Sequence, residues 1–221
     1  MFSKYLTNAD AAGPEDPFNR RLSKAVGSTD QTHQLKIVYA YDLPFGKGRT
    51  LLNRGGIVNA VLGGWRAAGN NSYLSGTPIA LTTTVSFPLG DGTFVNTPTI
   101  TTYDGWRGTT SAGKFDPNKD RFFQPASFFG TQPTTQFGNA TRTNPKVRNF
   151  AGLNENVSLA KAFPIHESVR AEFRAESFNV LNRTLFGPSS GALSLQNANF
   201  GLWATQANTP RQMQLALKLY F

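Results

Sequence analysis

The chain ends on PRQMQLALKLYF, residues 210–221, a stretch in which apolar and polar side chains alternate. One parity holds Met213, Leu215, Leu217, Leu219 and Phe221. The other parity holds Gln212, Gln214, Ala216, Lys218 and Tyr220. A period of two predicts a β-strand whose two faces meet different surroundings. Because chain ends fray unless they are held, we expect this strand to be paired with another segment.

The segment 167–182, ESVRAEFRAESFNVLN, is helical by composition, since it is rich in Ala, Glu and Arg. A helix would place like charges four residues apart, which is mildly destabilising. A strand instead separates the residues cleanly into two faces. One face carries Val169, Ala171, Phe173 and Ala175, and the other carries Arg170, Glu172, Arg174 and Glu176. The pattern therefore favours a strand.

Further extended segments complete the map. The segment 32–45 alternates with Leu35, Ile37, Tyr39 and Tyr41 on one face. The segment 154–164 alternates as well, except at Lys161, whose long side chain we expect to snorkel toward water. The predicted strands are 1–7, 32–45, 64–83, 154–164, 167–181 and 211–221. A helical or irregular connector occupies 46–63.

Long and short connections alternate along this map. The links 8–31, 84–153 and 182–210 are long, whereas 46–63 and 165–166 are shorter. In an up-and-down meander all long links then leave from one side, as in outer-membrane barrels with their short periplasmic turns. The sequence predicts an all-β fold, an antiparallel up-and-down meander of about six strands; this is a partial, unclosed outer-membrane β-barrel unless a soluble sandwich produces the same alternation of links by chance.

The apolar faces need a cover, which is either lipid or a packed protein core. A strand with alternating Arg and Glu indicates a wet, charge-paired surface, like the lumen of a large barrel. We therefore expect the charged ladder of Arg170, Glu172, Arg174 and Glu176 to face the lumen. The residues expected to face lipid are Leu35, Ile37, Tyr39, Tyr41, Val169, Phe173, Leu215, Leu217 and Leu219. The aromatic ends of the stripes at Phe45, Phe163 and Phe221 support this interpretation. A soluble β-sandwich binding module remains the alternative.

Composition excludes several kinds of chemistry. The chain has no cysteine, and its two histidines, His33 and His166, are far apart, so no metal site or cofactor is expected. The net charge of +9 is spread along the chain without a nucleic-acid-binding motif, so no nucleic acid is expected as a partner. Glu172 and Glu176 are interpreted as members of a self-neutralising wall, and no enzyme activity is expected.

Several stretches together resemble the late barrel of TonB-dependent outer-membrane receptors of the Oar-like subgroup. They are DPFNRRLSKAVGSTDQTHQLKIVYAYDLPFGKGR (16–49), VNAVLGGW (58–65), YLSGTPIALTT (73–83), FGNATRTNPKVRNFAGLNENVSLAKAF (137–163), VRAEFRAESFNVLNRTLFG (169–187) and the closing PRQMQLALKLYF. Their order covers essentially the whole chain.

The resemblance implies a cell-outer-membrane transporter or receptor that takes up a substrate. Residues 1–221 would be the C-terminal segment of its barrel, without signal peptide or plug, and Met1 would not be the native start. Implied partners are outer-membrane lipid and lipopolysaccharide, the missing N-terminal barrel and plug, and TonB through them. Another implied partner is the outer-membrane assembly machinery. It would read a C-terminal signal made of Met213, Leu215, Leu217, Leu219, Tyr220 and Phe221.

Overall fold

The chain divides into two compact units, each described here by itself. The computed structural model describes residues 2–8, 18–21, 23–53, 55–84, 87–88, 94–95, 97–102, 104–108, 110, 114–130, 135–136, 138–166 and 169–221. The loop unit comprises Met1–Gln34, Leu74–Ala151 and Leu185–Asn208, and the sheet unit comprises Leu35–Tyr73, Gly152–Thr184 and Thr209–Phe221. Residues 167–168, at which a predicted strand begins, lie outside the described residues.

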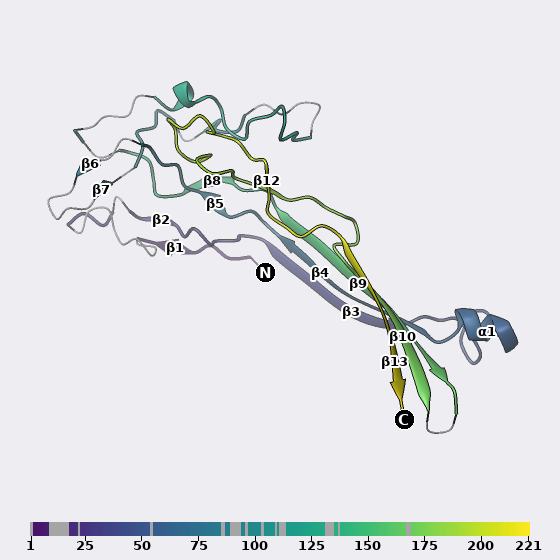
Figure 1. The fold of residues 1–221 in the computed structure, drawn as a ribbon. Helices are drawn as coiled ribbons and strands as arrows, with labels where there is room; N and C mark the ends of the chain where they lie inside the picture. The colour runs from purple at the N-terminus through teal and green to yellow at the C-terminus, as the bar shows by residue number, and fades with distance from the viewer. Residues whose placement is uncertain are drawn as a thin grey trace. The chain divides into compact units, whose positions relative to one another are not determined.

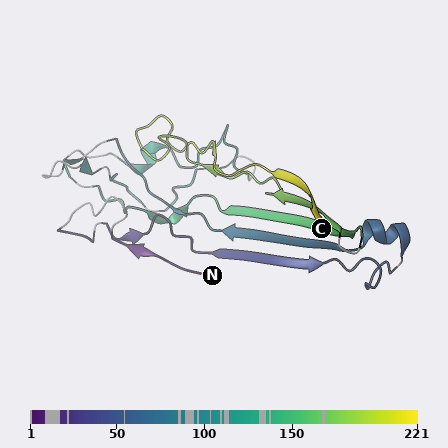
Figure 2. The same cartoon turned by 60° about the horizontal axis from the view of Figure 1, so that its bottom comes forward.

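The sheet unit is built on one five-stranded sheet. Its strands are β3 (Gln34–Asp42), β4 (Trp65–Leu74), β9 (Gly152–Pro164), β10 (Arg170–Phe178) and β13 (Gln212–Tyr220). They lie side by side in the order β13-β10-β9-β4-β3 (Figure 1, Figure 2). Neighbours in this sheet are also consecutive along the chain, if the short strands of the loop unit are left out. This open, up-and-down arrangement confirms the predicted all-β, antiparallel fold of a partial barrel.

The segment whose composition favours a helix is the strand β10. It pairs antiparallel with β13 on one side and with β9 on the other. Phe173 thereby lies opposite Leu217 on β13 and opposite Lys161 on β9. The strand forms because alternation lets one face stay apolar and the other charged, and such pairing outweighs a weak intrinsic helix propensity.

Two predicted strands differ from the structure. The strand predicted over 64–83 ends at Leu74, and Pro78–Ile79 forms β5, which pairs with β8 (Asn144–Arg148) in the loop unit. Pro78 has no N–H for a ladder. Gly76 lies against the backbone of Asn149, where an added Cβ would sit 1.8 Å from the carbonyl oxygen.

The predicted strand 1–7 does not join the sheet either. It contributes only β1 (Leu6–Thr7), which pairs with β2 (Ala25–Val26) inside the loop unit. The sheet therefore has five strands within the described residues, rather than about six. Its two outer strands, β3 and β13, have no further partner there.

The connector between β3 and β4 contains the helix α1 (Gly56–Leu62), as its sequence suggested. Gly56 enters the helix with φ +68°, a conformation that glycine adopts without steric cost. Gly63 ends it where an added Cβ would lie 2.3 Å from the side-chain oxygen of Asn59. No helix among the described residues has the length and hydrophobicity needed to cross a bilayer.

The loop unit contains the buried core. Its strand pairs are short, and besides β1–β2 and β5–β8 they include β6 (Phe87–Pro88) with β7 (Phe94–Val95) and β11 (Phe186–Gly187) with β12 (Thr205–Gln206). A 3-10 helix spans Ala126–Phe129. Aromatic and aliphatic side chains form the core, with the rings of Phe122 and Trp203 stacked 4.0 Å apart. The predicted long connections thus fold into a packed structure.

Asp30 ties distant segments of the loop unit together. Its side chain accepts hydrogen bonds from the backbone N–H of Tyr5 at 2.7 Å and the hydroxyl of Thr32 at 3.1 Å, and it pairs with Arg148 at 2.7 Å. Burial alone would raise the pKa of Asp30. The hydrogen bonds and the Arg148 charge outweigh burial, so the pKa lies below its ordinary value of 3.8.

Candidate functional site

The register of the sheet gathers the apolar side chains on one face. On β13, Leu215, Leu217 and Leu219 lie opposite Ala175, Phe173 and Ala171 of β10. On β9, Leu159 and Phe163 lie opposite the same alanines. The ring of Trp65 on β4 meets Phe173 edge-on at 6.2 Å, which places Trp65 on this face too. We call this surface the apolar face.

The apolar face is not covered within the described residues. Leu217 is 68% exposed and Tyr39 is 37% exposed, while Val169 and Phe173 are half-buried. The other residues expected to face lipid are exposed as well: Leu35, Ile37, Tyr41, Leu215 and Leu219. Each such side chain left in water costs about 1.5–3 kcal/mol relative to burial. The structure therefore leaves a face that needs a hydrophobic partner.

The soluble β-sandwich alternative is wrong for this sheet. A sandwich would pack the apolar face against a second sheet, yet Ala171 is the one fully buried hydrophobic residue of the sheet unit in the part of the chain described. The other fully buried hydrophobic residues belong to the loop unit.

The opposite face carries the charged ladder. Arg174 reaches Glu172 at 2.9 Å and Glu176 at 3.6 Å. The amide of Gln214 on β13 donates to Glu176, and the guanidinium of Arg170 lies 4.6 Å from the ring centre of Tyr220. All four predicted ladder residues therefore share one face, where the two carboxylates are held by Arg174.

A further ion pair, between β3 and β4, lies on the charged face, and sequence reasoning missed it. Arg66 of β4 reaches Asp42 of β3 at 2.8 Å. Arg66 follows Trp65 and so points away from the apolar face. The two residues are 24 positions apart, and only the pairing of β3 with β4 brings them together.

Lys161 does not behave as expected. It lies on the apolar face and is only 4% exposed, so it does not snorkel to water. Its ammonium donates to the carbonyl oxygens of Ala60 at 2.5 Å and Val61 at 3.1 Å, at the end of α1. The rings of Phe163 and Trp65 lie 5.0 Å and 5.7 Å away. The helix carbonyls replace water as the partner of the charge.

A polar network, which the sequence did not reveal, joins the start of β9 to the segment that follows β10. Arg183 Nε contacts both carboxylate oxygens of Glu155 at 3.0 Å. Asn179, in a left-handed conformation with φ +51°, accepts the N–H of Arg183 and donates to the carbonyls of Arg183 and Thr209. Asn tolerates this conformation better than most residues, and the FNVLN letters at the strand end are the signal for such a turn.

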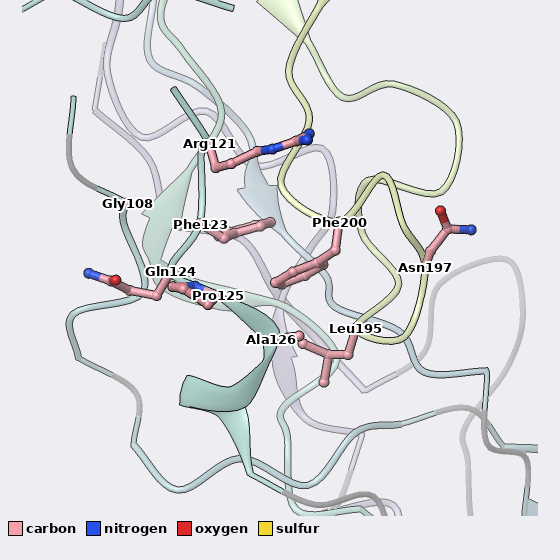
Figure 3. A pocket seen from close by; sticks show the side chains of 9 residues that line it. All are labelled: Gly108, Arg121, Phe123, Gln124, Pro125, Ala126, Leu195, Asn197 and Phe200. Atoms are coloured by element: carbon pink, nitrogen blue, oxygen red, sulfur yellow. The ribbon is translucent and has the colours of Figure 1, made fainter. Parts of the chain in front are cut away.

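The loop unit contains a pocket of about 430 Å³. Its floor is apolar, with Phe123 and Phe200 stacked 5.3 Å apart. Arg121, Gln124 and Asn197 supply polar groups along its wall (Figure 3). Among the described residues, no group of three His, Asp or Glu side chains is placed to hold a metal ion. The acidic segment 116–120 is a turn that closes on itself, since Asp120 accepts the N–H of Asp116 at 2.7 Å.

An open antiparallel sheet with one bare apolar face and one charged face has the construction of a membrane β-barrel wall. A family model described as an outer membrane beta barrel domain matches residues 1–214. The chain belongs to this family, and its place is the outer membrane, as the sequence predicted. No curated protein and no solved structure matches the chain.

Proposed function

We propose that this chain forms the C-terminal part of the barrel of a TonB-dependent transporter, close to the Oar-like subgroup. One observation carries the proposal. The sequence blocks that resemble this class, taken in order along the chain, contain the strands in which apolar and polar residues alternate. The apolar face, including Phe173 and Leu217, contacts outer-membrane lipid and lipopolysaccharide. The ladder from Arg170 to Glu176 lines the lumen through which a substrate passes.

The two unpaired sheet edges support a larger barrel. Open edges are not tolerated in hydrocarbon, because each unpaired N–H and C=O would lack a partner. Five strands are also fewer than the 8 of the smallest barrels. The edges of β3 and β13 therefore receive strands from an N-terminal barrel segment of the same protein. That segment also supplies the plug and the contact with TonB.

The exposed terminal strand supports a role in assembly. Phe221 is 92% exposed, and Met213, Leu215, Leu217 and Leu219 are exposed along the same face. These residues, together with Tyr220, form the signal by which the outer-membrane assembly machinery recognises the last strand. No enzyme activity is part of this proposal, in which Arg174 pairs with both carboxylates of the ladder as part of the wall.

The experiment is to read the coding sequence upstream of residue 1, and then to test the complete product for binding to the periplasmic domain of TonB. We expect an in-frame plug and further strands, and co-purification with TonB that is lost when the segment preceding the plug is deleted. A stop codon directly upstream, or a complete barrel that does not bind TonB, would overturn the proposal.

A further inference from the structure

Helix α1 is apolar and unburied. Its sequence, GIVNAVL, contains no charged residue, and none of its residues is buried. Ile57 is 83% exposed and Val61 is 58% exposed, and Val58 and Leu62 are exposed as well. If this helix lay in water, it would expose a continuous hydrophobic patch. Proteins avoid such patches unless a protein, a ligand or a membrane covers them.

The helix is fixed to the apolar face. The ammonium of Lys161 holds the carbonyls of Ala60 and Val61, and the indole N–H of Trp65 donates to the same Val61 carbonyl at 2.9 Å. Lys161 and Trp65 both lie on the apolar face. The end of α1 therefore continues the surface on which Phe173 and Leu217 lie, rather than the charged surface behind it.

The helix lies at the short-connection end of the sheet. The turn after β9 and the exposed Phe221 are at the same end (Figure 1). Short connections mark the periplasmic side of outer-membrane barrels. Leu51, Leu52 and Ile165 add exposed apolar side chains to this end.

The charged residues near α1 in the sequence are all positive, which favours a membrane surface as its environment. The connection 43–63 carries Lys47, Arg49 and Arg54 and no Asp or Glu, and of these cations Arg49 lies 3.8 Å from Asp42 at the end of β3. Apolar side chains on one short helix, flanked by cations, are typical of segments that lie in the plane of a membrane interface. Cations close to the surface also attract anionic phospholipid headgroups.

We infer that α1 is an interfacial membrane helix, which lies in the periplasmic phospholipid leaflet beside the barrel. Ile57, Val58, Val61 and Leu62 enter the boundary between headgroups and acyl chains. Lys161 holds the helix against the sheet, because its ammonium donates to the carbonyls of Ala60 and Val61 in α1. This inference rests on the outer-membrane location of the family and does not depend on TonB.

The test places an environment-sensitive fluorophore on a single cysteine in the intact protein, reconstituted in phospholipid vesicles that contain an anionic lipid. The described chain offers no competing thiol, because its sequence has no cysteine. Ile57→Cys and Val61→Cys report on the helix, and Thr50→Cys is the control in the same connection. Folding of each variant is checked by its resistance to dissociation on an unheated gel.

We expect lipids brominated on the acyl chain to quench both helix labels several-fold more than the Thr50 label, and iodide in the water to quench them several-fold less. Strong iodide quenching without lipid quenching would overturn the inference, since α1 would then lie in water. Protection from both quenchers would overturn it too, because a protein, such as a second copy of the chain, would then cover the helix.

Discussion

Phe173 and Leu217 lie directly opposite each other across β10 and β13, while the next residue of β10, Arg174, holds Glu172 and Glu176 on the reverse face. Within one residue step the sheet changes from a face that is apolar except at Lys161 to a face of ion pairs. Such a change requires a different environment on each side of the sheet, and we propose that in this outer membrane beta barrel domain these environments are lipid and water.

A charge on the apolar face is expected to be costly in lipid. Leu215→Arg should destabilise the intact protein by about 2–4 kcal/mol when it is unfolded by urea from lipid vesicles. The matched variant Gln214→Arg places the same charge one residue earlier, opposite Glu176, and should change the free energy of unfolding by less than about 0.5 kcal/mol. Equal costs for the two variants would contradict the assignment of the faces.

The ladder is expected to depend on its central cation. Arg174→Gln leaves Glu172 and Glu176 on one face without the cation that lies between them. Because these groups are partly exposed, the loss should be about 0.5–1 kcal/mol and should shrink at high salt. Urea unfolding at low and at high ionic strength measures it. Arg170→Gln, which removes a contact with Tyr220 rather than an ion pair, serves as the control and should show little salt dependence.

Loss of the Lys161 ammonium is expected to release α1 and to leave the sheet folded. Lys161→Met keeps the aliphatic stem between Trp65 and Phe163 but removes the donor to the helix carbonyls. Backbone amides of 56–62 should then exchange with deuterium at least about tenfold faster, because a seven-residue helix has little stability of its own. If the amides of 56–62 exchange as slowly as in the parent protein, the proposal that the Lys161 ammonium holds α1 in place is contradicted.

The loop unit is expected to lose stability in acid through Asp30. The pKa of Asp30 is lowered in the folded state, so its contribution is complete above about pH 5 and is lost as the pH falls through 3.8 toward the folded pKa. Asp30→Asn should destabilise the unit by about 3–5 kcal/mol at pH 7, since the largely buried Arg148 loses its carboxylate and keeps only the backbone carbonyls of residue 30 and Gly76.

Thermal unfolding followed by the fluorescence of Trp106 and Trp203 measures both effects, because these two tryptophans lie in the core of that unit. The difference between the parent protein and Asp30→Asn should narrow as the pH falls below 3.8. A difference that stays constant down to acid pH would contradict the assignment of this stability to the Asp30 carboxylate.

The strands whose two faces differ were predictable from sequence. The period of two is visible in β10 and β13 without any knowledge of their partners. The end of β4 was not predictable, because it depends on where Gly76 meets the backbone of Asn149. Lys161 was misread for a similar reason, since the carbonyls that bind it come from α1, about 100 residues earlier.

The core of the loop unit also lay beyond sequence reasoning. The 18 phenylalanines indicated a large apolar surface, but its members carry no period. Phe122 and Trp203 stack although the segments that carry them are irregular and far apart in the chain. Irregular segments have no repeat that shows which side chains turn inward, so composition predicts that a core exists without placing it.

Thiol accessibility along β13 tests the central claim most directly. Each residue from Gln212 to Leu219 is replaced by cysteine, one at a time, in the intact protein in lipid vesicles, and treated with a charged, membrane-impermeant maleimide. We predict that positions 212, 214, 216 and 218 react, whereas 213, 215, 217 and 219 are protected by lipid. Equal reaction at both parities, or the reverse pattern, would contradict the account.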